Sequence, residues 1–550
     1  LLQVRALLGG QGWYDLRNHA LNPPYGENIH WSRLVDLPIA GLILLFKPLG
    51  TGVAERIACA IAPMLPLFVA MLGMGIITRR LVHVYAYLLA LFLMMCALVA
   101  LSMFMPMRID HHGWQLALLV LTMAGMVDAR SSRGGLVMGL TSAASLAIGL
   151  EMIPFLAIAG GSVVLRWIAA EEGAEARMRT YGWALALGCM AGYGGFASYD
   201  NAVMRCDALT PVWLTMMVLA GGIAAALSFV PRAIMPIRLG LALISGMVLA
   251  GVFVDFFPQC LGRPEQVSDE VYRIWLSNVR EAKPLLIQPV MTLWSTIALP
   301  IAGLTGTLFA AKKARGTPVF VPWLTITLFT MAAFALTLWQ VRMGPATQLV
   351  AIPGAVALAW ALVPRAQASG QMLVRVFGTF AIFLFVSGIG ISAAAALWQT
   401  RHETIRSTKV SIYGRGAAPN PNIACLTLPV LTPLNRLPGS TIFTHVDLSA
   451  RLLLFTHHRA ISGPYHRNGD AILDVYHDFG GTPEQARVIM AHYGARYLLI
   501  CPGMNETTVY HARWPGGFYD QLIHGKVPDW LTPVTLPRNS PLKLWAIAQR

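Results

Sequence analysis

Charged residues are scarce in this sequence. They make up 12% of its 550 residues, against about 25% in soluble globular proteins. The deficit lies between residues 36 and 400, where apolar stretches recur that are long enough to cross about 30 Å of hydrocarbon. This pattern excludes a chain of ordinary soluble domains and predicts a polytopic α-helical membrane protein.

The sequence also lacks the short motifs of several enzyme classes. It has no glycine-rich phosphate loop, no Gly-x-Ser-x-Gly elbow, no His-Glu-x-x-His motif and no Cys-x-x-Cys pair. Basic runs interleaved with aromatic residues are absent as well. The net charge of +15 is therefore attributed to the Lys and Arg that membrane proteins hold in cytoplasmic loops, and no nucleic-acid partner is expected.

Hydrophobic segments long enough to be considered as membrane spans are numerous. Several contain Pro or Gly, which the interior of a helical bundle tolerates. Residues 34–47 are expected to form an interfacial helix instead, with Lys47 reaching the headgroups. The twelve predicted spans are residues 55–77, 81–104, 116–128, 134–149, 152–170, 181–198, 210–229, 239–257, 288–310, 319–340, 346–362 and 375–397.

The composition changes near residue 401 from long apolar stretches to the mixed polar and apolar sequence of a soluble protein. We therefore predict an extracytoplasmic first loop with an interfacial helix at residues 1–54, a transmembrane bundle with outward loops at 55–400, and a soluble extracytoplasmic α/β domain at 401–550. In that domain, residues 441–444 and 497–500 are predicted to be buried strands. Residues 483–493 are predicted to be a helix with Thr482 as its N-cap.

Alternate loops differ in their basic residues, which predicts the orientation. The short basic loops should be cytoplasmic, so the other loops, the N-terminal segment and the C-terminal domain should face the periplasm of a bacterial inner membrane. The basic loops hold Arg79, Arg80, Arg130, Arg133, Arg177, Arg179, Arg232, Arg238, Lys312, Lys313, Arg315 and Arg365.

Four of the seven cysteines fall on the side predicted to face outward. Because disulfides persist in oxidising compartments, we predict two pairs, Cys206–Cys260 and Cys425–Cys501. The alternative is four unpaired buried cysteines. The other three cysteines lie within predicted spans.

The N-terminal stretch is dense in aromatic, His, Arg and Asp residues, and Asp15 is a candidate catalytic acid within it. Interfacial anchoring explains a tryptophan such as Trp31. It does not explain why His30, Arg33 and Asp36 follow one another at intervals of three, as on one stripe of a helix near the bilayer. We expect part of this cluster, including Trp31, to bind substrate.

The next outward loop reads Arg-Ile-Asp-His-His at residues 108–112. Asp110, His111 and His112 can bind a divalent cation or transfer protons. The alternative is a short polar loop with solvated side chains. Glu151 lies between two apolar segments, where an acid is costly unless it faces a polar cavity or a partner.

Three further regions supply candidates. The long loop at 258–287 contains Glu265, a possible metal ligand, although most of its acids are expected to be solvated. Arg342 stands at the end of a predicted span, where it can bind a phosphate or reach lipid headgroups. The segment Tyr465-His466-Arg467 is interpreted as a loop that helps to hold an acceptor or an anionic group, with a solvated turn as the alternative.

These motifs carry a family resemblance. Trp-Tyr-Asp-Leu-Arg at 13–17, Asn-Pro-Pro-Tyr-Gly at 22–26, His-Trp-Ser-Arg-Leu-Val-Asp-Leu-Pro at 30–38 and Arg-Ile-Asp-His-His at 108–112 resemble bacterial membrane glycosyltransferases of the GT-C superfamily. These enzymes are similar in layout to oligosaccharyltransferase catalytic subunits. The resemblance implies transfer of a sugar from a polyprenyl-phosphate-linked donor to an extracytoplasmic lipid, glycan or protein acceptor.

The resemblance also implies roles for residues and cofactors. In such enzymes a first span leads into a loop that opens with acidic residues, so a thirteenth span and that motif would precede Leu1. Asp110 and His111 take the place of the second-loop acidic motif, and Glu265 loosely that of a later acid. A divalent cation, Mg or Mn, is implied, with membrane lipids as partners and no redox cofactor.

Two other functions fit a polytopic chain. A transporter or flippase of lipid-linked substrates would show repeated halves and polar residues in mid-span. The sequence has no convincing internal repeat, and its unusual polar residues cluster in outward loops. A non-catalytic accessory subunit would show the loop cluster without a cavity behind it.

Overall fold

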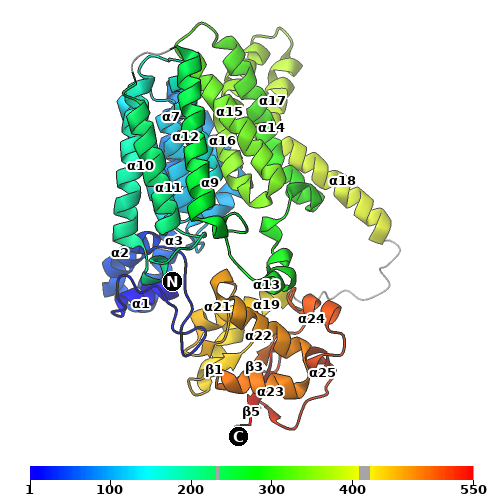
Figure 1. The fold of residues 1–550 in the computed structure, drawn as a ribbon. Helices are drawn as coiled ribbons and strands as arrows, with labels where there is room; N and C mark the ends of the chain where they lie inside the picture. The colour runs from blue at the N-terminus through cyan, green and yellow to red at the C-terminus, as the bar shows by residue number, and fades with distance from the viewer. Residues whose placement is uncertain (231–233, 408–420, 549–550) are drawn as a thin grey trace. The chain divides into compact units, whose positions relative to one another are not determined.

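The computed structural model describes residues 1–230, 234–407 and 421–548, so Arg232 of the basic loops lies outside the described residues. The chain divides into two compact units. The helical unit comprises residues 31–264 and 280–411, and the α/β unit comprises residues 1–30, 265–279 and 412–550. Figure 1 labels the elements of both.

Several helices of the helical unit run side by side in Figure 1. The unit contains α2 (Asp36–Phe46), α3 (Thr51–Ile61), α4 (Met64–Leu81), α5 (Ala86–Cys96), α6 (Leu98–Leu101), α7 (His112–Met126), α8 (Ser131–Ile148), α9 (Ile153–Ile168), α10 (Ala174–Phe196), α11 (Pro211–Leu227), α12 (Met235–Phe256), α14 (Val290–Lys313), α15 (Phe320–Trp339), α16 (Gly344–Gln367), α17 (Thr379–Val386) and α18 (Ile389–Ser407).

Each of the twelve predicted hydrophobic segments lies on a helix or on a bent pair of helices. Among the described residues, five stretches are long and apolar enough to cross a membrane, and the number rises to seven if two bent pairs each form one span. The bends are 75° between α5 and the helix after it and 81° between α17 and α18. The apolar helices are thus present, whereas the count of twelve spans is not established by their length and composition.

Helices α14 and α16 pack with their backbones in close contact. A Cβ atom on Gly306 would lie 1.9 Å from the carbonyl oxygen of Gly354, and one on Gly354 would lie 2.0 Å from that of Gly303. Small residues permit such an approach between membrane helices. In α16, 78% of the residues in its most apolar stretch are buried, so this helix lies in the core of the bundle.

Helix α12 is packed very differently. Only 6% of the residues in its most apolar stretch are buried, and Arg238 is the one buried residue of the helix. Arg238 donates hydrogen bonds to the Trp167 carbonyl (2.6 Å) and to Glu175 (2.8 Å). Just beyond the other end of α12, Cys260 forms a disulfide with Cys206. The helix is therefore held at its two ends.

Arginines cap the C-terminal end of α7. The last carbonyls of a helix have no partner within it, and three guanidinium groups from α4, α9 and α10 supply donors here. Asp128, just after the helix, accepts from Arg80 (3.0 Å) and Arg133 (2.7 Å). The capping bonds run from Arg80 to Ala124 (2.7 Å), from Arg166 to Met126 (2.8 Å) and from Arg177 to Gly125 (2.8 Å).

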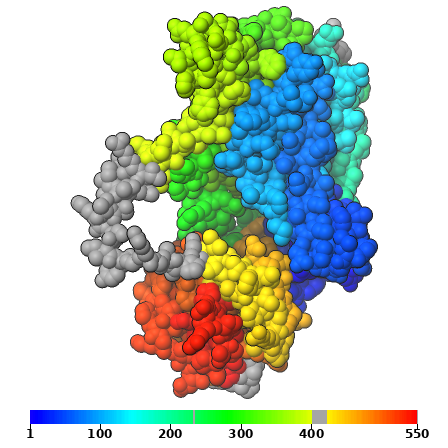
Figure 2. All heavy atoms as spheres, turned by 180° about the vertical axis from the view of Figure 1, so that it is seen from behind, coloured from blue at the N-terminus to red at the C-terminus, as the bar shows by residue number. Residues whose placement is uncertain are grey.

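The α/β unit has a five-stranded sheet of order β2-β1-β3-β5-β4. Its first three strands in this order are parallel, and β5 and β4 are antiparallel to their neighbours. In Figure 2 the closely packed atoms of this C-terminal part run from yellow to red. The strands are β1 (Thr441–Phe443), β2 (Arg459–Ala460), β3 (Ala495–Ile500), β4 (Leu531–Pro533) and β5 (Lys543–Ile547).

Helices lie between these strands in sequence. They include α21 (Val446–Phe455), α22 (Gly469–Gly480), α23 (Pro483–His492), α24 (Thr507–Arg513) and α25 (Phe518–Ile523). Helix α23 begins with a capping box, because Thr482 and Gln485 satisfy each other's backbone N–H groups. The predicted strands at 441–444 and 497–500 and the predicted helix at 483–493 are confirmed.

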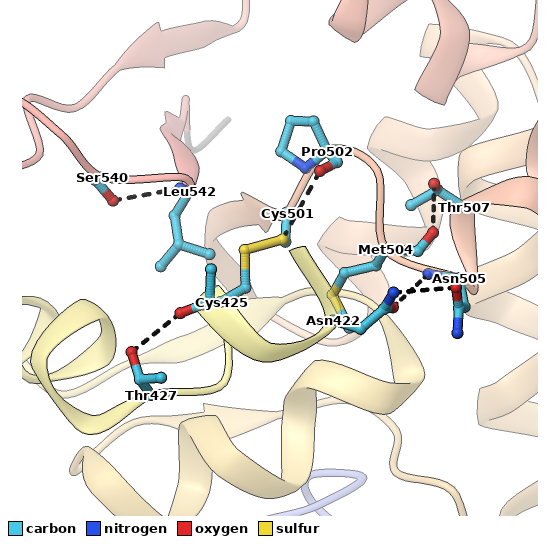
Figure 3. Close-up of a disulfide and its surroundings, with 11 residues drawn as sticks. Asn422, Cys425, Thr427, Cys501, Pro502, Met504, Asn505, Thr507, Ser540 and Leu542 are labelled. Carbon is cyan, nitrogen blue, oxygen red and sulfur yellow. Dashed lines mark hydrogen bonds between the residues drawn. A yellow bond between two sulfur atoms is a disulfide. The ribbon is translucent and has the colours of Figure 1, made fainter. Parts of the chain in front are cut away.

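Two segments remote in sequence belong to the α/β unit. The N-terminal segment joins it through a bridge between Leu21 and Ala460, and the short helix α13 (Asp269–Ile274) packs against α22. The predicted disulfide Cys425–Cys501 is present and fastens the segment before β1 to the end of β3 (Figure 3). The predicted Cys206–Cys260 bridge is also present, in the helical unit.

Candidate functional site

A cluster of His and carboxylate side chains surrounds the N-terminal end of α7. We define this histidine–carboxylate cluster as Asp110, His111, His112, Gln115 and Glu151. The first three lie at the end of the loop before α7 and at its first residue, and Gln115 lies one turn further along the helix. Glu151 lies in the turn between α8 and α9. Two loops predicted to carry function therefore meet in the helical unit.

Both oxygens of Glu151 are engaged within the cluster. His111 Nε2 lies 2.8 Å from Oε1, and the Gln115 amide donates to Oε2 at 2.6 Å. His111 is 5% exposed. A carboxylate that holds one ring nitrogen orients the imidazole and selects its tautomer. Glu151 thus has the partner that was expected of an acid between two apolar segments.

Gly149 gives the Glu151 carboxylate its place. A Cβ atom at residue 149 would lie 2.4 Å from Glu151 Oε2 and 3.2 Å from the Gln115 amide nitrogen. A larger residue would therefore displace the carboxylate or its partner. Helix α8 ends at Ile148, and Gly149 is the first residue of the short turn that leads to α9.

Asp110 is the second acid of the cluster. Its carboxylate accepts from Arg108 Nε (2.8 Å) and from the backbone N–H of His112 (3.1 Å), and it pairs with the His112 ring at 3.4 Å. Burial alone would raise the pKa of Asp110, but the hydrogen bond and charge of His112, together with Arg108, lower it to about 2. Asp110 is therefore ionised at neutral pH.

His112 responds in the opposite direction. Burial would lower its pKa, but the hydrogen bond and the charge of Asp110, reinforced by Glu151 and Glu281, raise it. The cluster therefore favours a protonated His112 beside an ionised Asp110.

Trp31 covers one side of the cluster. Its ring centroid lies 5.1 Å from that of His111, and the rings of His111 and His112 lie 4.2 Å apart. Arg33, which is completely buried, pairs with Asp36 at 3.3 Å. The predicted stripe is wrong for His30, because the helical turn begins only at Arg33, after Ser32.

Arg342 makes a local contact. Its Nε donates to the side chain of Gln340 at 2.7 Å. The backbone N–H of the residue between them donates to the carbonyl of Lys283 (3.0 Å), which fixes this turn against the long loop. The predicted phosphate contact of Arg342 stays a prediction.

The α/β unit brings together a second set of candidates. The rings of His30 and His466 lie 4.8 Å apart, and Arg467 donates to the side-chain oxygen of Asn28 at 2.8 Å. About 440 residues of sequence separate the partners. The C-terminal segment 465–467 therefore lies against the N-terminal segment, and neither pattern alone predicts this contact.

Two other predicted site residues lie in the α/β unit. Asp15 accepts from the backbone N–H of Arg17 (3.0 Å) and pairs with His19 (3.2 Å). Burial would raise its pKa, but these two contacts, with Gln11, lower it. Glu265 is half-buried in the long loop. The ligand set proposed from the sequence thus draws on both units, with Asp110, His111 and His112 in the helical one.

Sequence reasoning missed several polar residues beside these sites. Gln115 was overlooked although it lies one turn after the His-His pair, at the spacing that places side chains on one helix face. Glu27, Asn28 and Asn468 were overlooked because they lie in short irregular segments, a β-bridge, the residue after it and the end of a 3-10 helix, whose local sequence shows no burial pattern. Their importance depends on contacts between distant segments.

The chain shares its fold with a solved oligosaccharyltransferase, the layout that the resemblance to the GT-C superfamily predicted. No family model matches the sequence, and no curated protein matches it. The archaeal oligosaccharyltransferase AglB from Archaeoglobus fulgidus, solved with an inhibitory peptide and a dolichol-phosphate, has a TM-score of 0.67 at 14% identity. The match covers 100% of this chain and 69% of that one.

Two further structures resemble the chain. A complex of the Archaeoglobus fulgidus oligosaccharyltransferase with Zn and sulfate has a TM-score of 0.61 at 14% identity, covering 94% of this chain and 65% of that one. ArnT from Cupriavidus metallidurans bound to undecaprenyl phosphate has a TM-score of 0.46 at 12% identity, covering 99% and 92%. At these identities the likeness concerns the fold.

Proposed function

We propose that this protein transfers a sugar from a polyprenyl-phosphate-linked donor to an acceptor on the periplasmic side of a bacterial inner membrane. The observation that carries the proposal is the buried His111–Glu151 pair beside an ionised Asp110. It stands on a fold whose solved example AglB holds a dolichol-phosphate. The lipid tail of such a donor requires apolar helices, and its phosphate requires positive charge near the interface.

In this proposal the His111–Glu151 pair is the general base. The acceptor group gives its proton to the pair as its oxygen or nitrogen bonds to the anomeric carbon of the sugar. The bond from that carbon to the phosphate oxygen breaks, and the polyprenyl phosphate leaves with its electron pair. Asp110, fixed by Arg108, keeps His112 protonated, so that a positive charge faces the departing phosphate.

A divalent cation fits the donor set of the cluster. The two carboxylates of the cluster are oxygen ligands of the type that Mg²⁺ and Mn²⁺ prefer, whereas its two imidazoles are more typical of Zn²⁺ and other transition metals. Asp110 and Glu151 would hold the cation, which would neutralise charge on the donor phosphate. His112, predicted from the sequence as a ligand, would join them only after losing the proton that Asp110 stabilises. His111 stays a predicted additional ligand, and Glu265, the other residue predicted from the sequence as a ligand, belongs to the α/β unit. The oligosaccharyltransferase complex with Zn and sulfate shows a metal in a structure of this fold.

The α/β unit holds the other residues that were predicted to bind substrate. His30, Tyr465, His466 and Arg467 would contact the sugar or the acceptor, and Asp15 is the further predicted acid. The disulfides Cys206–Cys260 and Cys425–Cys501 support an oxidising location for the loops that hold them, as the orientation of the basic loops does.

A transfer assay tests the proposal. The full chain in lipid nanodiscs is given radiolabelled sugars on polyprenyl phosphate with candidate acceptors, and labelled product is measured. General acid–base catalysis contributes about 10²–10⁴-fold, so we expect His111→Ala and Asp110→Ala to reduce the rate by that factor. Glu175→Gln is the matched control, because this acid also forms an ion pair, with Arg238. No transfer by the native chain, or native rates in both variants, would overturn the proposal.

A further inference from the structure

Two buried side chains of the α/β unit have hydrogen-bonding atoms without partners. Glu27 is 1% exposed, and neither carboxylate oxygen has a partner among the described residues. Asn468 is 6% exposed, and its amide nitrogen likewise has no acceptor there. Buried polar atoms in native proteins nearly always have a partner, so such an exception calls for a ligand or an ordered water.

The two groups belong to one local structure. The Asn22 amide donates to Asn468 Oδ1 (3.0 Å), and the Gly26 N–H donates to the Asn22 carbonyl (3.0 Å). Glu27 follows directly and pairs its backbone with Asn18 (2.8 and 3.0 Å). The turn that contains Glu27 is therefore fastened to the residue that carries the unmet donor.

An aromatic side chain lies near Glu27. Tyr465 lies close enough that, after burial, the charge of Glu27 is the further cause that raises the tyrosine pKa to about 12. The neighbouring rings of His30 and His466 and the Arg467–Asn28 bond lie in the same two segments. Arg467 disfavours a cation here, and Glu27 disfavours an anion.

We propose that Glu27 and Asn468 bind the hydroxyl groups of a sugar ring. A sugar hydroxyl is both donor and acceptor, so it can satisfy a carboxyl oxygen and an amide N–H together. Burial raises the pKa of Glu27 well above its usual value, and a neutral carboxyl group can itself donate to a hydroxyl. The subsite deepens the proposed function, on which it rests, because it adds sugar recognition to that transfer.

Ligand-detected NMR tests the subsite without a lipid donor. The full chain in nanodiscs is mixed with free neutral monosaccharides that differ at single hydroxyl groups, and saturation transfer to the sugar protons is recorded. We expect binding that distinguishes epimers, because a site built for a hydroxyl leaves buried groups unpaired when that hydroxyl is misplaced. Absence of binding, or equal binding of all epimers, would mean that water alone fills the site, and would overturn the proposal.

Variants localise the binding. Loss of one buried hydrogen bond weakens binding about tenfold, so Glu27→Ala and Asn468→Ala should each do so for the preferred epimer. The matched control is Asp478→Ala, which removes another completely buried carboxyl group of the same unit that has no partner among the described residues. Thermal unfolding identifies variants that fail to fold. If a variant fails to fold, the epimer preference of the native chain decides whether the sugar subsite exists.

The transfer assay separates the two proposals. If the native chain transfers sugar and Glu27→Ala does so equally well at all donor and acceptor concentrations, the subsite is wrong and the proposed function stands. If the native chain binds epimers selectively but transfers no sugar from any polyprenyl donor, the proposed function fails while the sugar-binding residues remain.

Discussion

His111 and Glu151 lie 2.8 Å apart although 40 residues separate them in the sequence. Helices α7 and α8 account for this, because they pack as an antiparallel pair. The end of α8, next to Glu151, therefore lies beside the start of α7, next to His111. The pair also explains why Gln115, one turn into α7, reaches the other oxygen of Glu151.

Replacing Gly149 should impair catalysis without unfolding the protein. In Gly149→Ala the new methyl group would lie 2.4 Å from Glu151 Oε2, so the carboxylate must move, which disturbs its contacts with Gln115 and His111. We expect sugar transfer to fall at least about tenfold, since a displacement of 1 Å at a reacting group can cost about 10²-fold. Gly161→Ala is the control, because a Cβ atom there meets nothing within 4 Å. Equal rates in both variants would contradict the role of Glu151.

Stability should depend on pH through Glu506. Its carboxylate accepts from the backbone N–H groups of Val446 (2.9 Å) and Asp447 (2.8 Å) and from the Tyr510 hydroxyl (2.5 Å). Burial first, and then the charge of Asp447, raise its pKa to about 7. Because the folded state binds this proton more tightly than the unfolded state does, stability should fall as pH rises from the unfolded pKa, about 4.3, to about 7.

The variant Glu506→Gln isolates this effect. It removes the titration but keeps an oxygen for one of the helix N–H groups. Thermal unfolding of the full chain at pH 5 and pH 7 should show a smaller decrease for Glu506→Gln than for the native protein. Parallel decreases in the two proteins would assign the pH dependence to other groups.

The two disulfides should be detectable chemically. Peptide mapping without reductant should recover Cys206 linked to Cys260 and Cys425 linked to Cys501, with alkylation confined to the other three cysteines. Opening the Cys425–Cys501 bridge, whose residues are 76 apart, should destabilise the α/β unit by about 2–5 kcal/mol, as for native bridges of small domains. Alkylation of any of the four under denaturing, non-reducing conditions would count against that pair.

Arg177 should matter for stability rather than chemistry. Its guanidinium group is buried and donates to the carbonyls of Gly125 (2.8 Å) and Asp128 (2.5 Å). Arg177→Ala leaves these buried acceptors unpaired, which should cost about 2–3 kcal/mol. Arg365→Ala is the control, because Arg365 bonds to Ala361 of its own helix and is exposed. Chemical unfolding in mixed micelles should show a loss for Arg177→Ala only.

Local patterns in the sequence predicted much of the fold. Apolar runs located the helices of the bundle, because burial in a bilayer demands uninterrupted hydrophobicity over a whole span. Capping residues located α23, and the distribution of cysteines predicted both disulfides. The 81° bend between α17 and α18 was not predicted, because each half of that segment is equally apolar.

The candidate site was predictable only in part. Asp110, His111 and Glu151 stood out because polar residues are costly beside apolar spans. Glu27 and Asn468 did not, because their burial arises only when the N-terminal turn pairs with a segment more than 400 residues later. The prediction that His30 and Arg33 lie on one helical stripe was wrong for a related reason. A spacing of three residues places side chains on one face only within a helix, and His30 precedes the first helical residue.

Helix α12 is fastened by Arg238 at one end and by the Cys206–Cys260 bridge just beyond the other, with little packing between. In a bilayer its apolar faces would meet lipid tails rather than neighbouring helices. Its tilt must then follow the thickness of the membrane, since a span adjusts to hydrophobic mismatch by tilting. Lipids of different chain length should therefore act on this helix more strongly than on the buried α16, so that the composition of the membrane changes the tilt of α12 while the core of the bundle stays as it is.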